Sequence, residues 1–174
     1  MSGAAERPEG GLPDAGRARS GPAAAQPDAP DAGHAAYLRA LRADHLGEVV
    51  GEVPYRALAL VALRPTVREQ ARALAAVEVA TRLRLEAELA LHGAAPGRAA
   101  LVRALAWLVL LPALLLLPGR AWAALLLRVT TRAVASFERQ QARFGARNPE
   151  LFAWLVAHEV RQRDWARDQL RGGP

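Results

Sequence analysis

Side chains that can bind metal or transfer protons recur at helical spacing within residues 42–55. They are His45, Glu48, Glu52 and Tyr55. In a helix they share one face, because alternating steps of three and four residues return to the same side. The face begins with Leu38 and Leu41, as a core stripe would. A buried carboxylate is unstable without a partner. The pattern therefore predicts that a metal ion or an arginine lies beside these acids.

Three later helical segments also carry an acid on an otherwise apolar stripe. With Glu48, the predicted inner acids are Glu78, Glu138 and Glu159. Four inward carboxylates, one from each helix of a bundle, form the framework of a site for two divalent cations. In the usual arrangement two of the glutamates are followed at i+3 by histidine. Thr81 and Gln162 hold those positions here.

Five polar residues are predicted to support the ligands or to replace the missing ones. They are His45, Glu52, Thr81, His158 and Gln162. Neither a threonine hydroxyl nor a glutamine oxygen binds transition metals as well as an imidazole does. Glu86 and Glu88, outside this set, are expected on a solvated face.

The composition favours helices as the elements that position these groups. The chain of 174 residues is 52% hydrophobic but only 5% aromatic, so its apolar content is mainly Ala, Leu and Val. Helices are expected over about 34–63, 66–92, 120–144 and 148–171. The prediction is an all-α, ferritin-like four-helix bundle over residues 34–171, with a hydrophobic crossover segment between helices two and three.

Composition also limits the partners. Residues 1–33 are rich in Ala, Gly and Pro without a hydrophobic period, which predicts a disordered tail and no secretory signal. There is no cysteine, so a disulfide framework and a zinc finger are excluded. The net charge is +6, but the arginines are interleaved with acids. We therefore expect no nucleic-acid partner and favour a surface that faces anionic lipid, or simply a solvated, arginine-rich exterior.

The crossover, residues 98–119, is expected to face a membrane. It has no charged residue from Ala104 to Gly119, and Pro112 and Pro118 interrupt it. A straight transmembrane helix needs roughly 20 apolar residues. Peripheral attachment at the cytoplasmic face of the membrane is therefore predicted. A span that continues through Leu127 and an internal helix that covers the core are the alternatives.

One motif resembles a known family. Its residues are Arg42, Asp44, His45, Gly47, Glu48 and Tyr55. They are similar to the Arg-x-Asp-His-x-Gly-Glu opening, with its later Tyr, of the demethoxyubiquinone hydroxylases. Members are ferritin-like, membrane-bound di-iron monooxygenases of ubiquinone biosynthesis. The resemblance implies that Glu48, Glu78, Glu138 and Glu159 hold two iron ions. Tyr55 is the candidate catalytic residue, with an ordinary core tyrosine as its alternative.

Two functions follow from these patterns. The first is a monooxygenase-like oxidoreductase that acts on a membrane-borne quinone, with manganese as an alternative to iron. The second is a non-catalytic, membrane-associated helical bundle that has lost the metal site, which the missing histidines favour. A small integral membrane protein with one span is a third interpretation. The sequence leaves homo-oligomerisation open.

Overall fold

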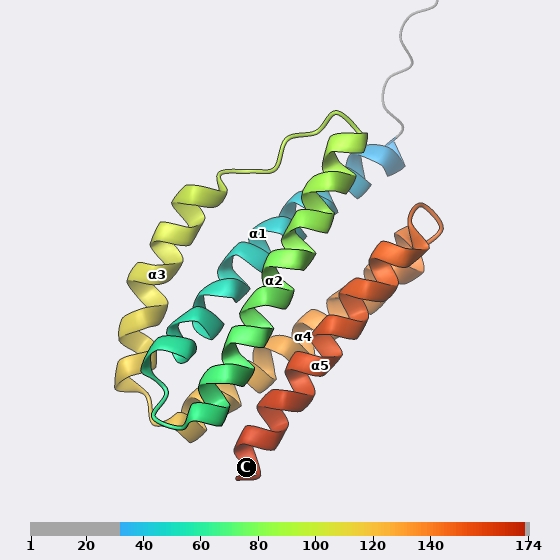
Figure 1. Cartoon of the computed structure of the whole chain (residues 1–174). Coiled ribbons are helices and arrows are strands. Elements are labelled where there is room, and N and C mark those ends of the chain that lie inside the picture. Colours follow the sequence, from blue (N-terminus) through green and yellow to red (C-terminus); the bar gives the residue numbers. More distant parts are fainter. Residues whose placement is uncertain (1–31, 173–174) are drawn as a thin grey trace, which may run out of the picture. The chain divides into compact units, whose positions relative to one another are not determined.

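The computed structural model describes residues 32–172, which form five helices and no strand (Figure 1). The helices are α1 (Ala32–Val61), α2 (Pro65–Leu91), α3 (Ala99–Leu116), α4 (Gly119–Phe144) and α5 (Pro149–Leu170). The predicted all-α class is therefore confirmed. The predicted tail over residues 1–33 lies outside the described residues, except that its last two residues already belong to α1.

Local sequence signals explain where the helices begin and end. Pro65 and Pro149 are the first residues of α2 and α5, where the missing N–H removes no helical hydrogen bond. The side-chain oxygen of Asn148 caps α5 by accepting from the Leu151 N–H at 3.0 Å. After α2, Gly93 takes a positive φ of 64°, a conformation that favours glycine.

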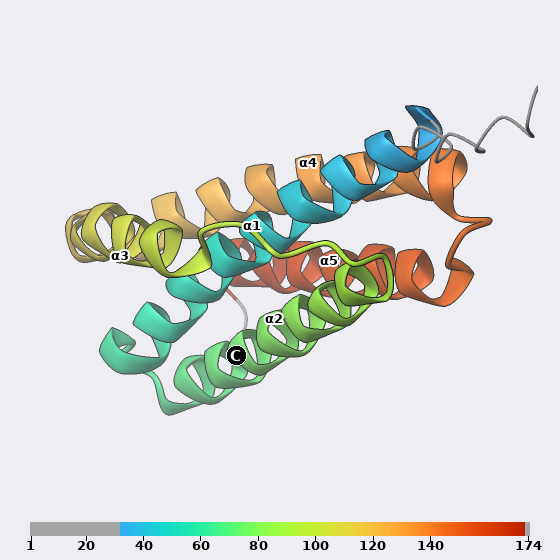
Figure 2. The same cartoon turned by 90° about the horizontal axis from the view of Figure 1, so that it is seen from above.

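The helices pack as two hairpins with α3 against the first of them. In the first hairpin α1 contacts α2, in the second α4 contacts α5, and α5 also contacts α2. Figure 2 shows α3 beside α1 at the edge of this arrangement. The crossover therefore covers α1 and leaves most of its own surface outside the packed helices.

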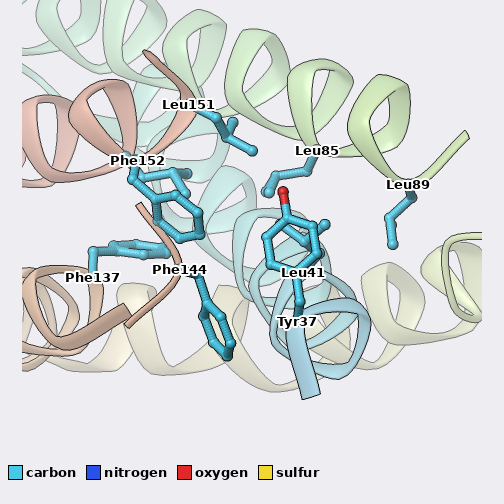
Figure 3. Close-up of a cluster of buried hydrophobic side chains, with 9 residues drawn as sticks. Tyr37, Leu41, Leu85, Leu89, Phe137, Phe144, Leu151 and Phe152 are labelled. Carbon is cyan, nitrogen blue, oxygen red and sulfur yellow. The ribbon is translucent and has the colours of Figure 1, made fainter. Parts of the chain in front are cut away.

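An apolar cluster joins four helices at one end, around the start of α1 and the end of α2 (Figure 3). Its buried members are Tyr37, Leu41, Leu85, Leu89, Phe137, Phe144, Leu151, Phe152 and Leu155. Tyr37 and Phe144 have ring centroids 5.6 Å apart. A second apolar cluster, which includes Tyr55, Trp122 and Leu126, lies at the other end of the same helices. Polar groups between these two clusters are thus held in an apolar frame.

The inward face of α4 differs from the prediction by one residue. Its buried residues include Leu126, Thr130, Val134 and Phe137. The predicted stripe passed instead through Leu127, Thr131, Val134 and Glu138, and Glu138 is exposed. Adjacent positions on a helix are about 100° apart, so this rotation replaces the acid with an aromatic ring. Burial of the large apolar Phe137 side chain explains the preference.

The predicted crossover forms α3, and its surface is mostly uncovered. Only 11% of the Ala99–Leu116 segment is buried, so an internal covering helix is not formed. Leu108 is 71% exposed and Leu116 is 82% exposed. The helix ends at Leu116 before Pro118, so no single helix continues through Leu127. By length and composition alone, α3 is apolar enough to cross a membrane.

Glu88, predicted to be solvated, is buried and connects three parts of the fold. It accepts hydrogen bonds from the Tyr37 hydroxyl at 2.5 Å and from the Asn148 amide at 2.8 Å. The His92 imidazole lies 3.2 Å from the same carboxylate. Burial alone would raise the pKa of Glu88, but these hydrogen bonds outweigh it and lower the pKa. Glu88 therefore ties α2 to α1 and to the turn before α5.

We expect Glu88→Gln to lower the free energy of unfolding at pH 7 by about 2 kcal/mol, because charge-assisted hydrogen bonds are lost. The folded-state pKa of Glu88 lies below its ordinary value of 4.5, so the carboxylate stabilises the fold above that pH. This stabilisation is lost as the pH falls through the lowered pKa. Urea unfolding at pH 7 and pH 3 should show the difference between wild type and variant shrinking. Exposed Glu69 provides the control, since Glu69→Gln should leave the free energy of unfolding unchanged at both pH values. An equal deficit at both pH values would contradict this assignment.

Candidate metal centre

Polar side chains from three helices meet between the two apolar clusters. They are Glu48 of α1, Glu78 of α2, and His158, Glu159 and Gln162 of α5, and all are buried. The inward stripes of α1 and α5 were predicted from their three- and four-residue steps, and burial confirms both. Helix α5 is far from α1 and α2 in the sequence, so tertiary packing creates the cluster.

Three of these side chains could hold one metal ion. The Nε2 atom of His158 lies 3.4 Å from Oε2 of Glu48 and 3.7 Å from Oε1 of Glu159. One ligand atom from each residue can be chosen so that all three lie within 4.8 Å of one another. That spacing is suitable for a common ion, because ligand oxygens and nitrogens lie about 2.0–2.2 Å from a transition metal.

Several atoms of this triad lack a hydrogen-bond partner within the described residues. They are Oε2 of Glu48, Oε2 of Glu159, and both ring nitrogens of His158. Buried polar atoms are rarely left unsatisfied, since each costs about 1–3 kcal/mol. A cation bound between these residues could satisfy the two carboxylate oxygens and one of the two ring nitrogens together.

Glu78 completes the carboxylate group but is held differently. It shares a side-chain hydrogen bond with Glu48, which requires one proton between the two carboxyl groups. The Gln162 amide donates a second hydrogen bond to Oε1 of Glu78. Glu78 can therefore reach an ion at Glu48 only if the shared proton leaves.

Burial changes the acidity of all three carboxyl groups. It raises the pKa of Glu48 to about 8, and the charges of Glu159 and Asp44 add to the rise while the Glu78 hydrogen bond opposes it. Burial also raises the pKa of Glu159 to about 7. It raises the pKa of Glu78 well above the ordinary value. Near neutral pH Glu48 and Glu78 therefore keep protons and Glu159 is only partly ionised, and a divalent cation would displace the protons.

Gly51 leaves the space that the Glu78 carboxylate occupies. A Cβ atom at position 51 would lie 2.9 Å from Oε2 of Glu78, closer than side chains tolerate. Gly47 lies one helical turn earlier in the same motif, and a Cβ there would meet no atom within 4 Å. Of these two glycines, only Gly51 is needed to leave room for a specific neighbour.

Tyr55 contacts the cluster through an amide and not through the ligand triad. Its hydroxyl donates to Oε1 of Gln162 at 2.8 Å, and the same amide donates to Glu78. Burial and then the neighbouring carboxyl groups raise the pKa of Tyr55 well above the ordinary value, so the phenol keeps its proton. Its ring lies 5.9 Å from that of Trp165. Tyr55 thus fixes the orientation of Gln162.

The two residues at the expected histidine positions have other partners. Thr81 donates to the Val77 carbonyl at 2.9 Å and accepts from the Trp154 indole at 2.9 Å. Gln162 bonds Glu78 and Tyr55. Neither side chain takes the place of a metal-binding imidazole in this arrangement.

Arginines hold Glu52, and His45 also lies away from the triad. The Glu52 carboxylate lies 2.5 Å from Nη2 of Arg56, 3.6 Å from Nη2 of Arg103 and 3.9 Å from Nε of Arg82. His45 pairs with Oε1 of Glu86 at 2.9 Å. For Glu52, the arginine alternative from the sequence is the one the structure forms.

The structure changes the predicted ligand set at two positions. Exposed Glu138 does not join the buried acids, so α4 contributes no carboxylate to the cluster. His158 was predicted only as a supporting or replacement group, because it points about 100° away from Glu159 on the helix. Yet it lies in the triad, since its Nε2 atom is close to a carboxylate oxygen of Glu48 and to one of Glu159. An adjacent His-Glu pair on a buried stripe was the available signal.

The resemblance to the hydroxylase family rests on the motif between residues 42 and 55. The chain matches no protein-family model, no curated protein and no solved structure.

Proposed function

We propose that this chain binds one divalent transition-metal ion between α1 and α5. Glu48, His158 and Glu159 would be the ligands, and Glu78 would join them once it gives up its shared proton. The observation that carries the proposal is that ligand atoms of three buried residues lie within 4.8 Å of one another. Each of these residues has at least one buried polar atom without a hydrogen-bond partner in the described part of the chain. One imidazole with carboxylates suits iron or manganese. One ion is proposed in place of two, because exposed Glu138 leaves α4 without a ligand acid.

Within this proposal the protein is an oxidoreductase of the demethoxyubiquinone hydroxylase type, with a ferritin-like architecture. The helix order supports this assignment, since α3 stands between the second and third long helices as a crossover does. When bound, a redox-active ion would supply dioxygen activation. The protein's own part is to exclude water with its two apolar clusters and to hold Glu78 through Gln162 and Tyr55.

A cavity beside Tyr55 supports a quinone ring as the substrate. It has a volume of about 590 Å³ and is lined mainly by apolar side chains, with Trp122 and Trp165 among them. Trp165 also contacts the Tyr55 ring. A ring bound in the cavity would thus be connected to Tyr55 through Trp165.

Contact with a membrane surface is part of the same proposal. The exposed side of α3 carries Leu105, Leu108 and Val109, each more than half exposed. Leu60 and Leu63, near the end of α1, are also largely exposed. Together they would give a lipid-soluble quinone a route from the cytoplasmic face of a membrane.

Addition of Mn²⁺ or Fe²⁺ under exclusion of oxygen to protein stripped of metal tests the proposal. We expect one ion to bind per chain, as measured by elemental analysis. At 100 times the dissociation constant, binding should stabilise the fold by about 2.7 kcal/mol, or roughly 5–10 °C in melting temperature. The background is measured with a variant in which the order of residues 42–55 is scrambled. If neither metal binds to the wild type above this background, the site is not a metal site.

A non-catalytic, membrane-associated bundle is the second candidate. It is favoured because Gln162 and Thr81 have protein hydrogen-bond partners and need no metal. The two candidates give opposite results in the titration above. Retained vesicle binding without metal uptake would support the bundle.

A further inference from the structure

A groove runs over α1 between α2 and α3. Figure 1 shows these two helices on either side of α1. The groove has a volume of about 640 Å³. It is lined by Arg56, Ala59, Leu60, Arg72, Ala75, Ala76, Val79 and Trp107. It is separate from the metal centre and from the cavity beside Tyr55.

One part of the groove has more positive than negative charge. Arg56 lines it and also pairs with Glu52, which Arg82 and Arg103 approach from the flanking helices. Two arginines, Arg56 and Arg72, line the groove and no acid does, and Glu52 pairs with Arg56, so one positive charge remains in excess.

The two arginines that line the groove can be reached by a ligand. Arg56 and Arg72 are both exposed residues. A guanidinium group binds a phosphate oxygen through directed N–H donors. The two accessible guanidinium groups therefore suit an anionic group.

The rest of the groove is apolar. Its apolar lining residues are Ala59, Leu60, Ala75, Ala76, Val79 and Trp107. Leu60 is 74% exposed, although it is a large aliphatic side chain. A hydrocarbon chain would cover it. Tryptophan is common where an apolar surface meets lipid headgroups.

We propose that this groove binds one acidic phospholipid. The phosphodiester would lie beside Arg56 and Arg72, and an acyl chain would lie against Leu60 and Trp107. The inference goes beyond the proposed function, because neither the metal ligands nor the Tyr55 cavity takes part. The bound lipid would join α2 to α3, two helices that otherwise meet through the arginine pairs of Glu52.

The full-length protein should be titrated calorimetrically with dihexanoylphosphatidylglycerol below its critical micelle concentration, so that no bilayer is needed. Dihexanoylphosphatidylcholine and inorganic phosphate are the comparison ligands. We expect the phosphatidylglycerol to bind and both comparison ligands to bind at least fivefold more weakly. Arg72→Gln should weaken binding about fivefold, because one cation is removed. Leu60→Ser should also weaken it.

Two matched controls keep the test specific. Arg132→Gln removes an exposed arginine from α4, and Leu83→Ser changes an exposed leucine of α2 that does not line the groove. Both should bind as wild type does. Equal binding of the two lipids, equal binding of free phosphate, or equal effects of Arg72→Gln and Arg132→Gln would each overturn the proposal. Metal content is measured on the same samples and reports on the metal site separately.

Discussion

Replacing Glu48 by glutamine is expected to weaken the binding of Mn²⁺ or Fe²⁺ by about 100-fold or more, since even residues behind the ligands contribute 10–100-fold. The amide keeps the size of the side chain but loses the negative charge that the cation needs. The pKa of Glu48 is raised to about 8 by burial, so the charged form destabilises the metal-free fold. The variant should therefore melt no lower than wild type when metal is absent. Metal titration followed by calorimetry measures both quantities.

Glu138 provides the matched control for this experiment. It is a glutamate on a neighbouring long helix and is exposed, so Glu138→Gln should bind metal as wild type does. The family resemblance would make both acids ligands, whereas the packing of α4 leaves Glu138 exposed and only Glu48 among the buried acids. Equal losses in the two variants would show that α4 turns its acid inward in the metal-bound state. Unchanged metal affinity in both variants would rule out the proposed metal site.

Replacing Gly51 by alanine should disturb the metal centre without changing any polar group. The added methyl would lie 2.9 Å from Oε2 of Glu78, whose carboxyl group is fixed by Glu48 and Gln162. Overpacking of this kind costs about 1–3 kcal/mol. The shifted carboxylate should also lower metal affinity about 10-fold.

Gly47→Ala separates this steric effect from helix propensity. Both changes replace glycine by alanine within α1, which gains up to about 1 kcal/mol. A Cβ at position 47 meets no atom within 4 Å, so this variant should be as stable as wild type or more stable. Chemical denaturation should separate the two variants by about 2 kcal/mol. If both alanines stabilise equally, the carboxylate of Glu78 is not confined as described.

The sequence was sufficient to predict the inward faces of α1 and α5. On α5 the residues at three- and four-residue steps, Phe152, Leu155, Glu159, Gln162 and Ala166, are all buried. The same periodicity located Glu48 and Glu78, which are buried and share a hydrogen bond.

On α4 the sequence pattern fits two adjacent faces almost equally well as the buried face. The predicted and observed stripes share Val134, and each combines a leucine and a threonine before it. They differ at Phe137 and Glu138, where the family resemblance favoured the acid. Packing decided for the aromatic ring, which lies 6.3 Å from the ring of His158. Periodicity within one helix does not contain that long-range contact.

Glu88 and Glu52 show why partners are harder to predict than faces. Glu88 bonds Tyr37 and Asn148, which are 51 and 60 positions away in the chain. Glu52 pairs with Arg103 of α3, and no local pattern relates those two residues. A helical period tells which side chains point inward. Which inward acid meets an arginine and which meets another acid depends on how separate helices are set side by side.

The uncovered leucines and valines of α3 also govern how the purified protein behaves in a test tube. We expect two molecules in plain buffer to associate through this helix, because contact removes its exposed apolar side chains from water. Light scattering under those conditions would then report nonspecific association through apolar surfaces and overestimate the mass of the functional oligomer. A mild detergent that coats α3 gives the mass from which a subunit number should be taken.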